Sequence, residues 1–329
     1  KLNVELPTLN LSLEITGFDA AEVDSLLNLH IDPEQDPVDA MPKLQTDPIS
    51  QNGDVWRLHD HAIACDDACS EMALRRLMGR HHAAMVFADP PYNVRIAATV
   101  GRGTIKHREF LAASGELSPA QFKAFLKRFM RLATKFSSEG SVHFICMDWR
   151  HLSEILHAGQ DVYETLLNLV VWTKTNAGQG SFYRSQHELI FVFKKGAASH
   201  QNNIQLGRHG RNRSNVWSYA GVNTFRAGRL DDLAVHPTVK PIAMVADAMR
   251  DCTRRGDIVL DPFLGSGTTI LAAERVGRRA FGIEIDPLYV DVAIRRWQQF
   301  TGRDAILKST GQTFDEVATV RGVNSRRTP

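Results

Sequence analysis

The stretch from Asp257 to Glu284 constrains the fold most strongly, because a strand, a turn, a helix and a second strand follow one another in it without interruption. The apolar residues of 257–261 and 280–284 predict buried strands, and 268–276 predict a helix between them. Two strands joined by one helix normally lie parallel in the same sheet. The chain is therefore expected to contain a parallel sheet.

The turn inside this unit carries Gly265 and Gly267 and opens the helix, while Glu284 ends the second strand. Glycine lets the backbone approach a ligand at a helix N-terminus, and an acid at the next strand end can bind two ribose hydroxyls. The third glycine of a dinucleotide fingerprint is absent, because position 270 is Ile. The unit favours an adenosine-containing ligand without a pyrophosphate; a tight turn that binds nothing is the alternative.

A second constraint comes from the apolar run 85–88, which ends in Asp89-Pro90-Pro91-Tyr92. Proline cannot donate a hydrogen bond to a sheet, so the strand is expected to end at Asp89. Ligands of open α/β sheets bind beyond the carboxyl ends of the strands. The sequence thus predicts a site that holds a carboxylate, a rigid backbone and an aromatic ring together.

Strand and helix patterns alternate through most of the chain, which predicts an α/β fold with a mainly parallel, twisted sheet and helices on both faces. The regularity is lost between 196 and 235, where basic and aromatic residues interleave. The patterns divide the chain into 1–30 as the tail of a preceding domain, 31–52 as a linker, 53–195 as a first α/β half, 196–235 as an irregular region, 236–302 as a second α/β half, and 303–329 as a polar C-terminal tail.

Composition excludes several classes of protein. The 329 residues are 43% hydrophobic, with no apolar run of membrane-spanning length and no signal-peptide pattern. The 39 Lys and Arg against 37 Asp and Glu leave a net charge of +2, so a polyanionic partner must be bound by local clusters of positive charge. The four cysteines match neither a zinc pattern nor a disulfide framework and are interpreted as reduced core thiols. A soluble, cytoplasmic protein without a metal is expected.

Two polar segments contain such clusters of positive charge. Residues 93–115 form a long polar stretch, and 196–235 lacks any hydrophobic stripe. In 196–235, basic and aromatic side chains together suit a nucleic-acid surface, through phosphate contacts and base stacking; a solvated excursion is the alternative interpretation there. Polar loops as long as 93–115 are functional or disordered in most compact domains. The candidate nucleic-acid contacts in the two segments are Arg95, Arg102, Lys106, Arg108, Arg208, Arg211, Arg213 and Arg226.

Three separated motifs together resemble the S-adenosylmethionine-dependent amino-methyltransferases of DNA. They are Asp89-Pro90-Pro91-Tyr92, His236-Pro237-Thr238-Val239-Lys240-Pro241 and Asp261-Pro262-Phe263-Leu264-Gly265-Ser266-Gly267-Thr268-Thr269. Their order is that of the β group of this family, and the resemblance covers about residues 53–302. It implies a Rossmann-like methyltransferase fold, in which 53–195 is the catalytic half, 196–235 the target-recognition region and 236–302 the cofactor-binding half. Residues 1–50 resemble the tail and linker of a ParB-like domain of longer relatives, and that domain itself is expected to be missing.

The resemblance also assigns roles to individual residues. Catalysis and binding of the target base fall to Asp89, Pro90, Pro91 and Tyr92. The expected contacts to the cofactor S-adenosylmethionine are Asp67 and Ala68 on the adenine side, Glu284 on the ribose, Phe263, Gly265 and Gly267 around the methionine part, and Asp89, Lys240, Pro241, Asp261 and Thr268 elsewhere around it. Asp66 stands where many relatives have glycine, so the choice between Asp66 and Asp67 stays open.

The implied reaction is transfer of a methyl group to adenine N6 of a base flipped out of duplex DNA. An exocyclic amine is a poor nucleophile, and the Asp89 carboxylate and the Pro90 carbonyl are two acceptors that stabilise positive charge on it in the transition state. Tyr92 is expected to stack on the flipped base. The resemblance also suggests a homodimer and a nucleoid-associated location, with no metal.

Asp rather than Ser before the two prolines favours adenine by resemblance, and cytosine N4 is the alternative target. A methyltransferase for RNA or protein amides, or a non-catalytic DNA-binding module, are more remote alternatives. The methyltransferase interpretation has one geometric requirement. Asp89 and Gly265 must follow neighbouring strands at the same edge of one sheet.

Overall fold

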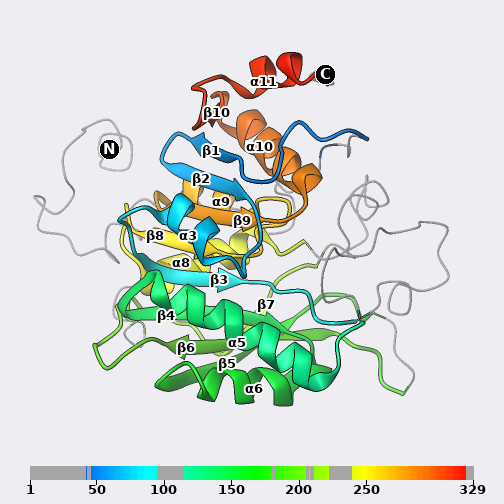
Figure 1. Ribbon diagram of the computed structural model, residues 1–329. Helices are drawn as coiled ribbons and strands as arrows, with labels where there is room; N and C mark the ends of the chain where they lie inside the picture. The colour runs from blue at the N-terminus through cyan, green and yellow to red at the C-terminus, as the bar shows by residue number, and fades with distance from the viewer. Residues whose placement is uncertain are drawn as a thin grey trace, which may run out of the picture.

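The computed structural model describes residues 42, 46–94, 115–178, 182–204, 207, 211–221 and 239–323 (Figure 1). Within these residues the chain forms one sheet of ten strands, in the order β10-β1-β2-β9-β8-β3-β4-β6-β5-β7. The strands are β1 (Val55–Leu58), β2 (His61–Cys65), β3 (Ala83–Ala88), β4 (Ser137–Met147), β5 (Thr165–Thr173), β6 (His187–Lys194), β7 (Val216–Ser218), β8 (Ile258–Asp261), β9 (Arg279–Glu284) and β10 (Ile306–Leu307).

The centre of the sheet is parallel, as predicted. Strands β2, β9, β8, β3 and β4 pair in parallel with one another in that order. Strand β6 lies between β4 and β5 and is antiparallel to both, so β4 and β5 run in the same direction. Strands β1 and β10 extend the other side of the sheet with antiparallel pairs. The carboxyl ends of β2, β9, β8, β3, β4 and β5 consequently lie at one edge.

Helices cover both faces of the sheet (Figure 1). One face is covered by α3 (Glu71–Met78), α5 (Pro119–Lys135) and α6 (Leu152–Gln160), and the other by α8 (Ile242–Cys252), α9 (Thr268–Val276) and α10 (Pro287–Thr301). The short 3-10 helix η3 (Trp149–His151) leads from β4 into α6. The predicted α/β architecture with helices on both faces is confirmed.

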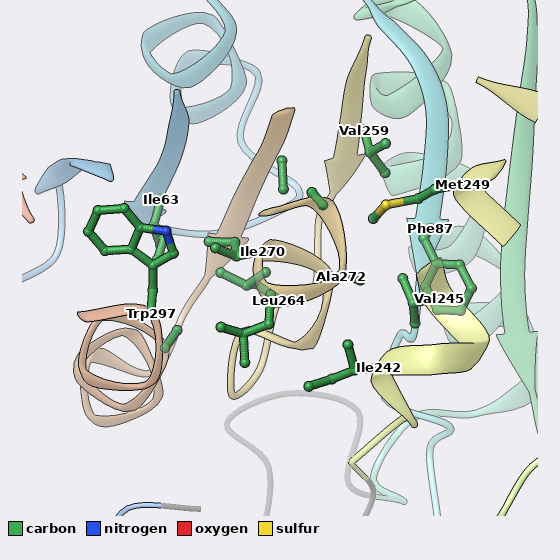
Figure 2. Packing of buried hydrophobic residues seen from close by; sticks show 14 of the residues in the cluster. Ile63, Phe87, Ile242, Val245, Met249, Val259, Leu264, Ile270, Ala272 and Trp297 are labelled. Atoms are coloured by element: carbon green, nitrogen blue, oxygen red, sulfur yellow. The ribbon is translucent and has the colours of Figure 1, made fainter. Parts of the chain in front are cut away.

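Each face of the sheet has its own hydrophobic core, and the side chains of β3 alternate between the two. Met85 and Phe87 join the core formed with α8, α9 and α10, whereas Val86 and Ala88 join the core formed with α3 and α5. Figure 2 shows side chains of the first core, among them Phe87 and Met249. Burial on both faces explains why the run before Asp89 is continuously apolar.

Local sequence signals set the ends of the helices near this sheet. Ser118 and Gln121 form a reciprocal capping box at the start of α5, and Pro119 occupies its first turn. Ser70 accepts a hydrogen bond from a backbone N–H of α3 in the same way. Both helices therefore begin at a serine whose side chain satisfies a backbone donor of the first turn.

Several elements lie where the sequence patterns predict none. Strand β7 falls inside the irregular region 196–235 and pairs with β5. Strand β10 and helix α11 (Phe314–Val320) fall inside the expected polar tail, and Phe314 packs edge-on against Trp56 with ring centroids 5.2 Å apart. This part of the expected tail therefore belongs to the core, because it covers an otherwise open end of the sheet.

The four cysteines are buried and not paired in disulfides. Burial raises the pKa of the Cys65 thiol to about 12 and that of Cys69 to about 11, so both stay protonated at neutral pH. None of the helices within the described ranges is both long and apolar enough to cross a lipid bilayer.

Candidate active site at the carboxyl edge of the sheet

Strands β3 and β8 are direct neighbours and run parallel, with Val86 paired with Leu260. Strand β3 ends at Ala88 and strand β8 at Asp261. Asp89 and the glycine turn that follows Asp261 therefore leave the sheet side by side at the same edge. This is the arrangement that the methyltransferase interpretation requires.

The glycine turn has a backbone that other residues rarely adopt. Gly265 has a φ of 53° and Gly267 a φ of 89°, and Gly267 is the N-cap of α9. A Cβ atom on Gly267 would lie 2.7 Å from the Cβ atom of Ala293 on α10. Gly267 is thus needed for the close packing of α9 on α10, a role that the sequence pattern does not reveal.

The buried Asp261 fixes the first part of the turn. Its carboxylate accepts hydrogen bonds from the backbone N–H of Phe263 at 3.0 Å and from the hydroxyl of Thr269 at 2.5 Å. Burial raises the pKa of Asp261 to about 7, although these two donors act in the opposite direction. Because both oxygens are used within the turn, Asp261 holds the turn in shape.

Glu284 ties the second part of the turn to the end of β9. One carboxylate oxygen accepts a hydrogen bond from the backbone N–H of Gly265 and the other from that of Asp286, each at 2.8 Å. Burial raises the pKa of Glu284 to about 7. Each oxygen has a second lone pair, so the ionised carboxylate can still accept two hydroxyl groups.

The end of β2 lies beside the end of β9, because Cys65 pairs with Glu284. Asp66 is held there by an ion pair with Arg76. Asp67 is exposed, and its carboxylate accepts one backbone N–H within its own turn. Of the two acids that the sequence left open, Asp67 is therefore the better placed to contact a ligand beside Glu284.

Other expected cofactor contacts lie at the same edge. Phe263 is half-buried and meets Phe129 of α5 edge to face, with ring centroids 4.9 Å apart. Ala68, after β2, and Thr268, at the start of α9, are buried. Ile270 is fully buried in the core, at the position where a dinucleotide fingerprint has its third glycine.

The acid-proline segment belongs to a compact hydrogen-bonded cluster, which we call the clamp and define as Asp89, Tyr92, Glu188 and Lys240. Asp89 Oδ2 accepts a hydrogen bond from Lys240 Nζ at 2.5 Å, and Asp89 Oδ1 accepts one from the Tyr92 hydroxyl at 2.6 Å. Pro241 is the N-cap of α8, which places Lys240 directly before this helix. The lysine predicted to flank the cofactor thus contacts the predicted catalytic carboxylate.

Glu188 is the member of the clamp that the sequence patterns do not reveal. Its carboxylate lies 3.1 Å from Lys240 Nζ and 3.1 Å from the Tyr92 hydroxyl, whose single proton is already accepted by Asp89, and it accepts a hydrogen bond from Lys174 Nζ at 2.5 Å. Two acids and two lysines therefore meet here with balanced charge. The one signal in the sequence is an acid near the start of an otherwise apolar strand, where burial is costly unless the charge is paired.

The charges of the clamp have unequal environments. Burial raises the pKa of Asp89. Burial also disfavours ionised Glu188, but Lys240 and Lys174 outweigh it and lower the pKa of Glu188 to about 2. Burial by itself lowers the pKa of Lys240, but the attraction of Asp89 and Glu188 outweighs burial and raises this pKa. At neutral pH Glu188 is a firmly held anion and Lys240 a firmly held cation, whereas the charge on Asp89 is the costly one.

The chain after the clamp acid is also held in place. Pro90 is buried and Pro91 half-buried. The Asn93 side chain donates a hydrogen bond to the carbonyl of Leu117 at 2.8 Å and accepts one from the backbone N–H of Gly115 at 3.1 Å. Asn93 thereby joins the two described ends of the polar stretch 93–115.

Two of the basic residues predicted to contact nucleic acid point into the protein instead. Arg211 pairs with Asp251 of α8, and Nε of Arg213 lies 3.1 Å from the same carboxylate. Arg213 also donates to the Tyr219 hydroxyl at 2.8 Å, and that hydroxyl donates to Asp247 at 2.6 Å. Because acids of α8 match both charges, these two guanidinium groups are not free to neutralise phosphates. They join the irregular region to α8.

The other six candidate contacts lie outside the described residues. They are Arg95, Arg102, Lys106, Arg108, Arg208 and Arg226.

The parallel sheet with a glycine turn, a strand-terminal acid and the clamp at one edge defines a Rossmann-like α/β fold. The solved PvuII DNA methyltransferase, described as cytosine-N4-specific, shares this fold with a TM-score of 0.56 and 15% sequence identity, over 86% of this chain and 95% of that chain. This chain belongs to the DNA methylase family N6_N4_Mtase, whose sequence model matches residues 83–295. The resemblance drawn from the three motifs is confirmed.

Two curated relatives are similar over most of their own length. The type II methyltransferase M.HpaI of Haemophilus parainfluenzae is 25% identical over 262 residues, which cover 75% of this chain and 77% of the relative. The type II methyltransferase M2.DpnII of Streptococcus pneumoniae is 27% identical over 223 residues, which cover 64% of this chain and 81% of the relative.

The N-terminal region has a match of its own. A ParB-methyltransferase HTH domain matches residues 4–52. The ParB-like part is therefore partly present, because this match falls on the stretch interpreted as a tail and linker, and the expectation that the domain is missing is corrected to that extent.

Proposed function

We propose that this chain transfers a methyl group from S-adenosylmethionine to N6 of an adenine that is flipped out of duplex DNA. The observation that carries the proposal is the position of Asp89 and the Gly265 turn after the neighbouring parallel strands β3 and β8. A methyl donor bound at the turn and an amine bound at the clamp meet at this one edge of the sheet.

The residues around the glycine turn fit the proposed cofactor. S-adenosylmethionine supplies an electrophilic methyl group on a positively charged sulfur. Glu284 has free lone pairs for the two ribose hydroxyls, and Asp67 lies beside it for the adenine side. The N-terminus of α9 at Gly267 suits the methionine carboxylate. The buried Ile270 is compatible with a ligand that has no pyrophosphate.

The clamp supplies what the target amine needs. The Asp89 carboxylate and the Pro90 carbonyl accept the two amine N–H groups, which draws the nitrogen lone pair out of the ring. Positive charge develops on the nitrogen as the methyl group arrives, and a fixed carboxylate stabilises this charge more in the transition state than in the ground state. Since the amine loses its proton only after methylation, Asp89 acts as an acceptor and needs no unusual basicity.

Access to Asp89 requires an exchange of partners. Oδ2 accepts a hydrogen bond from the Lys240 ammonium and Oδ1 accepts one from the Tyr92 hydroxyl; the target amine is proposed to replace Lys240, because a fixed cation on the same carboxylate opposes the positive charge that develops on the amine. Glu188 lies 3.1 Å from Lys240 Nζ and can hold this ammonium when Asp89 releases it. The exchange leaves Lys240 paired and exposes the negative charge of Asp89 to the amine. Glu188 is therefore proposed as a positioning residue of the site.

Adenine is the proposed target because Asp89 precedes Pro90 and Pro91, which is typical of adenine-N6 members in the resembled group. The fold match to a cytosine-N4-specific enzyme keeps cytosine N4 as the alternative. Both targets present an exocyclic amine to the same acceptors. The clamp chemistry is common to them, and the identity of the base is a separate question for the test.

The test is a transfer assay with tritium-labelled S-adenosylmethionine on duplex DNA, RNA and a protein mixture. Label is expected in duplex DNA, and label confined to RNA or protein would overturn the proposal. Asp89→Ala is expected to lose transfer to DNA. The matched control is Asp161→Ala, which removes an exposed acid paired with Lys127 and should leave transfer unchanged.

A further inference from the structure

The most exposed large apolar side chains in the described part of the chain are neighbours in the sequence. Phe182 is 86% exposed and Tyr183 82% exposed. Their rings meet edge to face with centroids 4.5 Å apart. We call these two residues the aromatic pair. Large rings gathered in water are typical of a surface that another molecule covers.

The aromatic pair belongs to the connection between β5 and β6, at the sheet edge that carries Asp89. Thr173, the last residue of β5, pairs with His187, the first residue of β6. Glu188 of the clamp follows directly, and Lys174 reaches it at 2.5 Å. The connection therefore presents the aromatic pair, and its first residue, Lys174, pairs with Glu188 of the clamp near the start of β6.

Hydrogen bonds fix the base of this connection. The backbone N–H of Gly178 donates to the carbonyl of Ser185 at 2.7 Å. Arg184 donates to the carbonyls of Ala177 at 2.7 Å and Gly178 at 3.0 Å. Because both sides of the connection are tied together beside the aromatic pair, little backbone ordering is needed when the rings meet a partner.

The charge of the connection favours a polyanion with flat apolar surfaces. Residues 174–187 contain no Asp or Glu; Lys174 is neutralised by Glu188, which leaves Arg184 and His187 as the basic residues of the connection. Aromatic rings beside positive charge suit nucleic-acid bases, whose faces stack on rings while their phosphates accept the charge. Among polyanions, DNA is favoured because the aromatic pair lies at the sheet edge that carries Asp89, where the proposed target base is bound.

We propose that the aromatic pair is a wedge that stacks on the DNA bases next to the target and fills the gap left when the target is extruded. This inference rests on the proposed function, because only an extruded base leaves such a gap. Extrusion breaks the stacking of the target on its neighbours, and inserted apolar side chains replace the lost contacts. The clamp then binds the extruded base, while the wedge occupies the position that this base has left in the duplex.

The test compares Phe182→Ala, Tyr183→Ala and the double variant with the wild type. The substrates are two synthetic duplexes that carry the recognition sequence, once sequencing of DNA methylated by the wild type has defined it. In one duplex the target base is paired, and in the other it lies opposite an abasic position. The control is Val320→Ala on α11, which truncates another exposed apolar side chain, 73% exposed, in a different part of the fold.

On the paired target, each single variant is expected to lower kcat/KM by about 5- to 150-fold. This range corresponds to the loss of one base-stacking contact, which is worth about 1 to 3 kcal/mol. On the target opposite the abasic position the loss should shrink to less than about threefold, because extrusion there costs little. The comparison distinguishes a wedge from a merely structural role, because a structural defect lowers kcat/KM equally on the two duplexes.

Three results overturn the inference in different ways. Equal losses on the two duplexes assign the aromatic pair to general folding or binding. No loss on either duplex removes it from the reaction, and a change from dimer to monomer without dependence on base pairing assigns it to a subunit interface. Failure of the wild type to methylate any duplex would instead contradict the proposed function itself.

Discussion

The charge on Glu188 should determine how easily Asp89 becomes available to the target amine. In the clamp, Lys240 Nζ lies 2.5 Å from Asp89 Oδ2 and 3.1 Å from Glu188 Oε2. Glu188→Gln keeps the shape and a hydrogen-bond acceptor but removes the charge that holds Lys240 during the exchange. The variant should therefore bind S-adenosylmethionine normally and transfer methyl groups slowly.

The magnitude follows from the distance and the burial of the pair. Two unit charges 3.1 Å apart interact by about 5 kcal/mol at an effective dielectric constant of about 20. Desolvation of the two charges reduces this interaction energy, and so does Lys174, which pairs with Glu188 as well. Removal of one partner of a buried ion pair typically costs about 3 kcal/mol or more. A barrier increase of about 3 kcal/mol corresponds to an about 100-fold lower kcat/KM.

The assay measures kcat and KM for methyl transfer to DNA, with cofactor affinity by calorimetry and folding by urea unfolding. Glu139→Gln is the matched control, because Glu139 is exposed and pairs only at 3.4 Å with Lys195. The double variant Glu188→Gln with Lys174→Met restores the charge balance and should recover stability without recovering kcat. A folded Glu188→Gln protein with wild-type kcat/KM refutes the exchange of partners.

Three further outcomes are expected. Asp89→Ala should abolish methyl transfer while calorimetry still detects cofactor binding; retained transfer would remove Asp89 from its role. Gly267→Ala should lower the free energy of unfolding in urea by about 2 to 4 kcal/mol, since its φ of 89° is strained for alanine and its Cβ atom meets Ala293; an unchanged midpoint would contradict this. Burial raises the pKa of Glu284 to about 7, so its protonated form stabilises the ligand-free protein at low pH, an effect lost as pH rises from about 4.5 toward 7. The ionised form binds the ribose, so cofactor affinity should fall as pH drops below 7, by up to about tenfold per pH unit; equal affinities at pH 6 and 8 would exclude this role.

The parts of the fold that local chemistry specifies were predictable from the sequence. The end of β3 before Pro90, the capped start of α5 at Ser118 and the glycine turn before α9 each depend on a few adjacent residues. The shared edge of Asp89 and Gly265 followed from the rule that parallel strands end together.

The clamp could not be predicted in full, because its contacts join distant positions. Lys240 and Asp89 are 151 positions apart, and Tyr92 and Glu188 are 96 apart. A sequence shows that Glu188 interrupts an apolar strand, but not which cation reaches it.

The same limit explains the failure at Arg211 and Arg213. Their basic character was visible, whereas the acids of α8 that match their charges lie 34 to 40 positions further along. A cluster of Arg in an irregular region can therefore be an internal connection as well as a nucleic-acid surface. Only the ion pairs of the folded chain distinguish the two.

The clamp is proposed to hold the exocyclic amine of an adenine in DNA while S-adenosylmethionine transfers its methyl group to it. The most direct measurement is mass spectrometry of nucleosides from duplex DNA incubated with the wild-type protein and S-adenosylmethionine, with Asp89→Ala in parallel. N6-methyladenine is expected with the wild type and none above background with the variant. N4-methylcytosine as the only product would contradict the choice of base, and methylated nucleosides formed equally by Asp89→Ala would contradict the clamp itself.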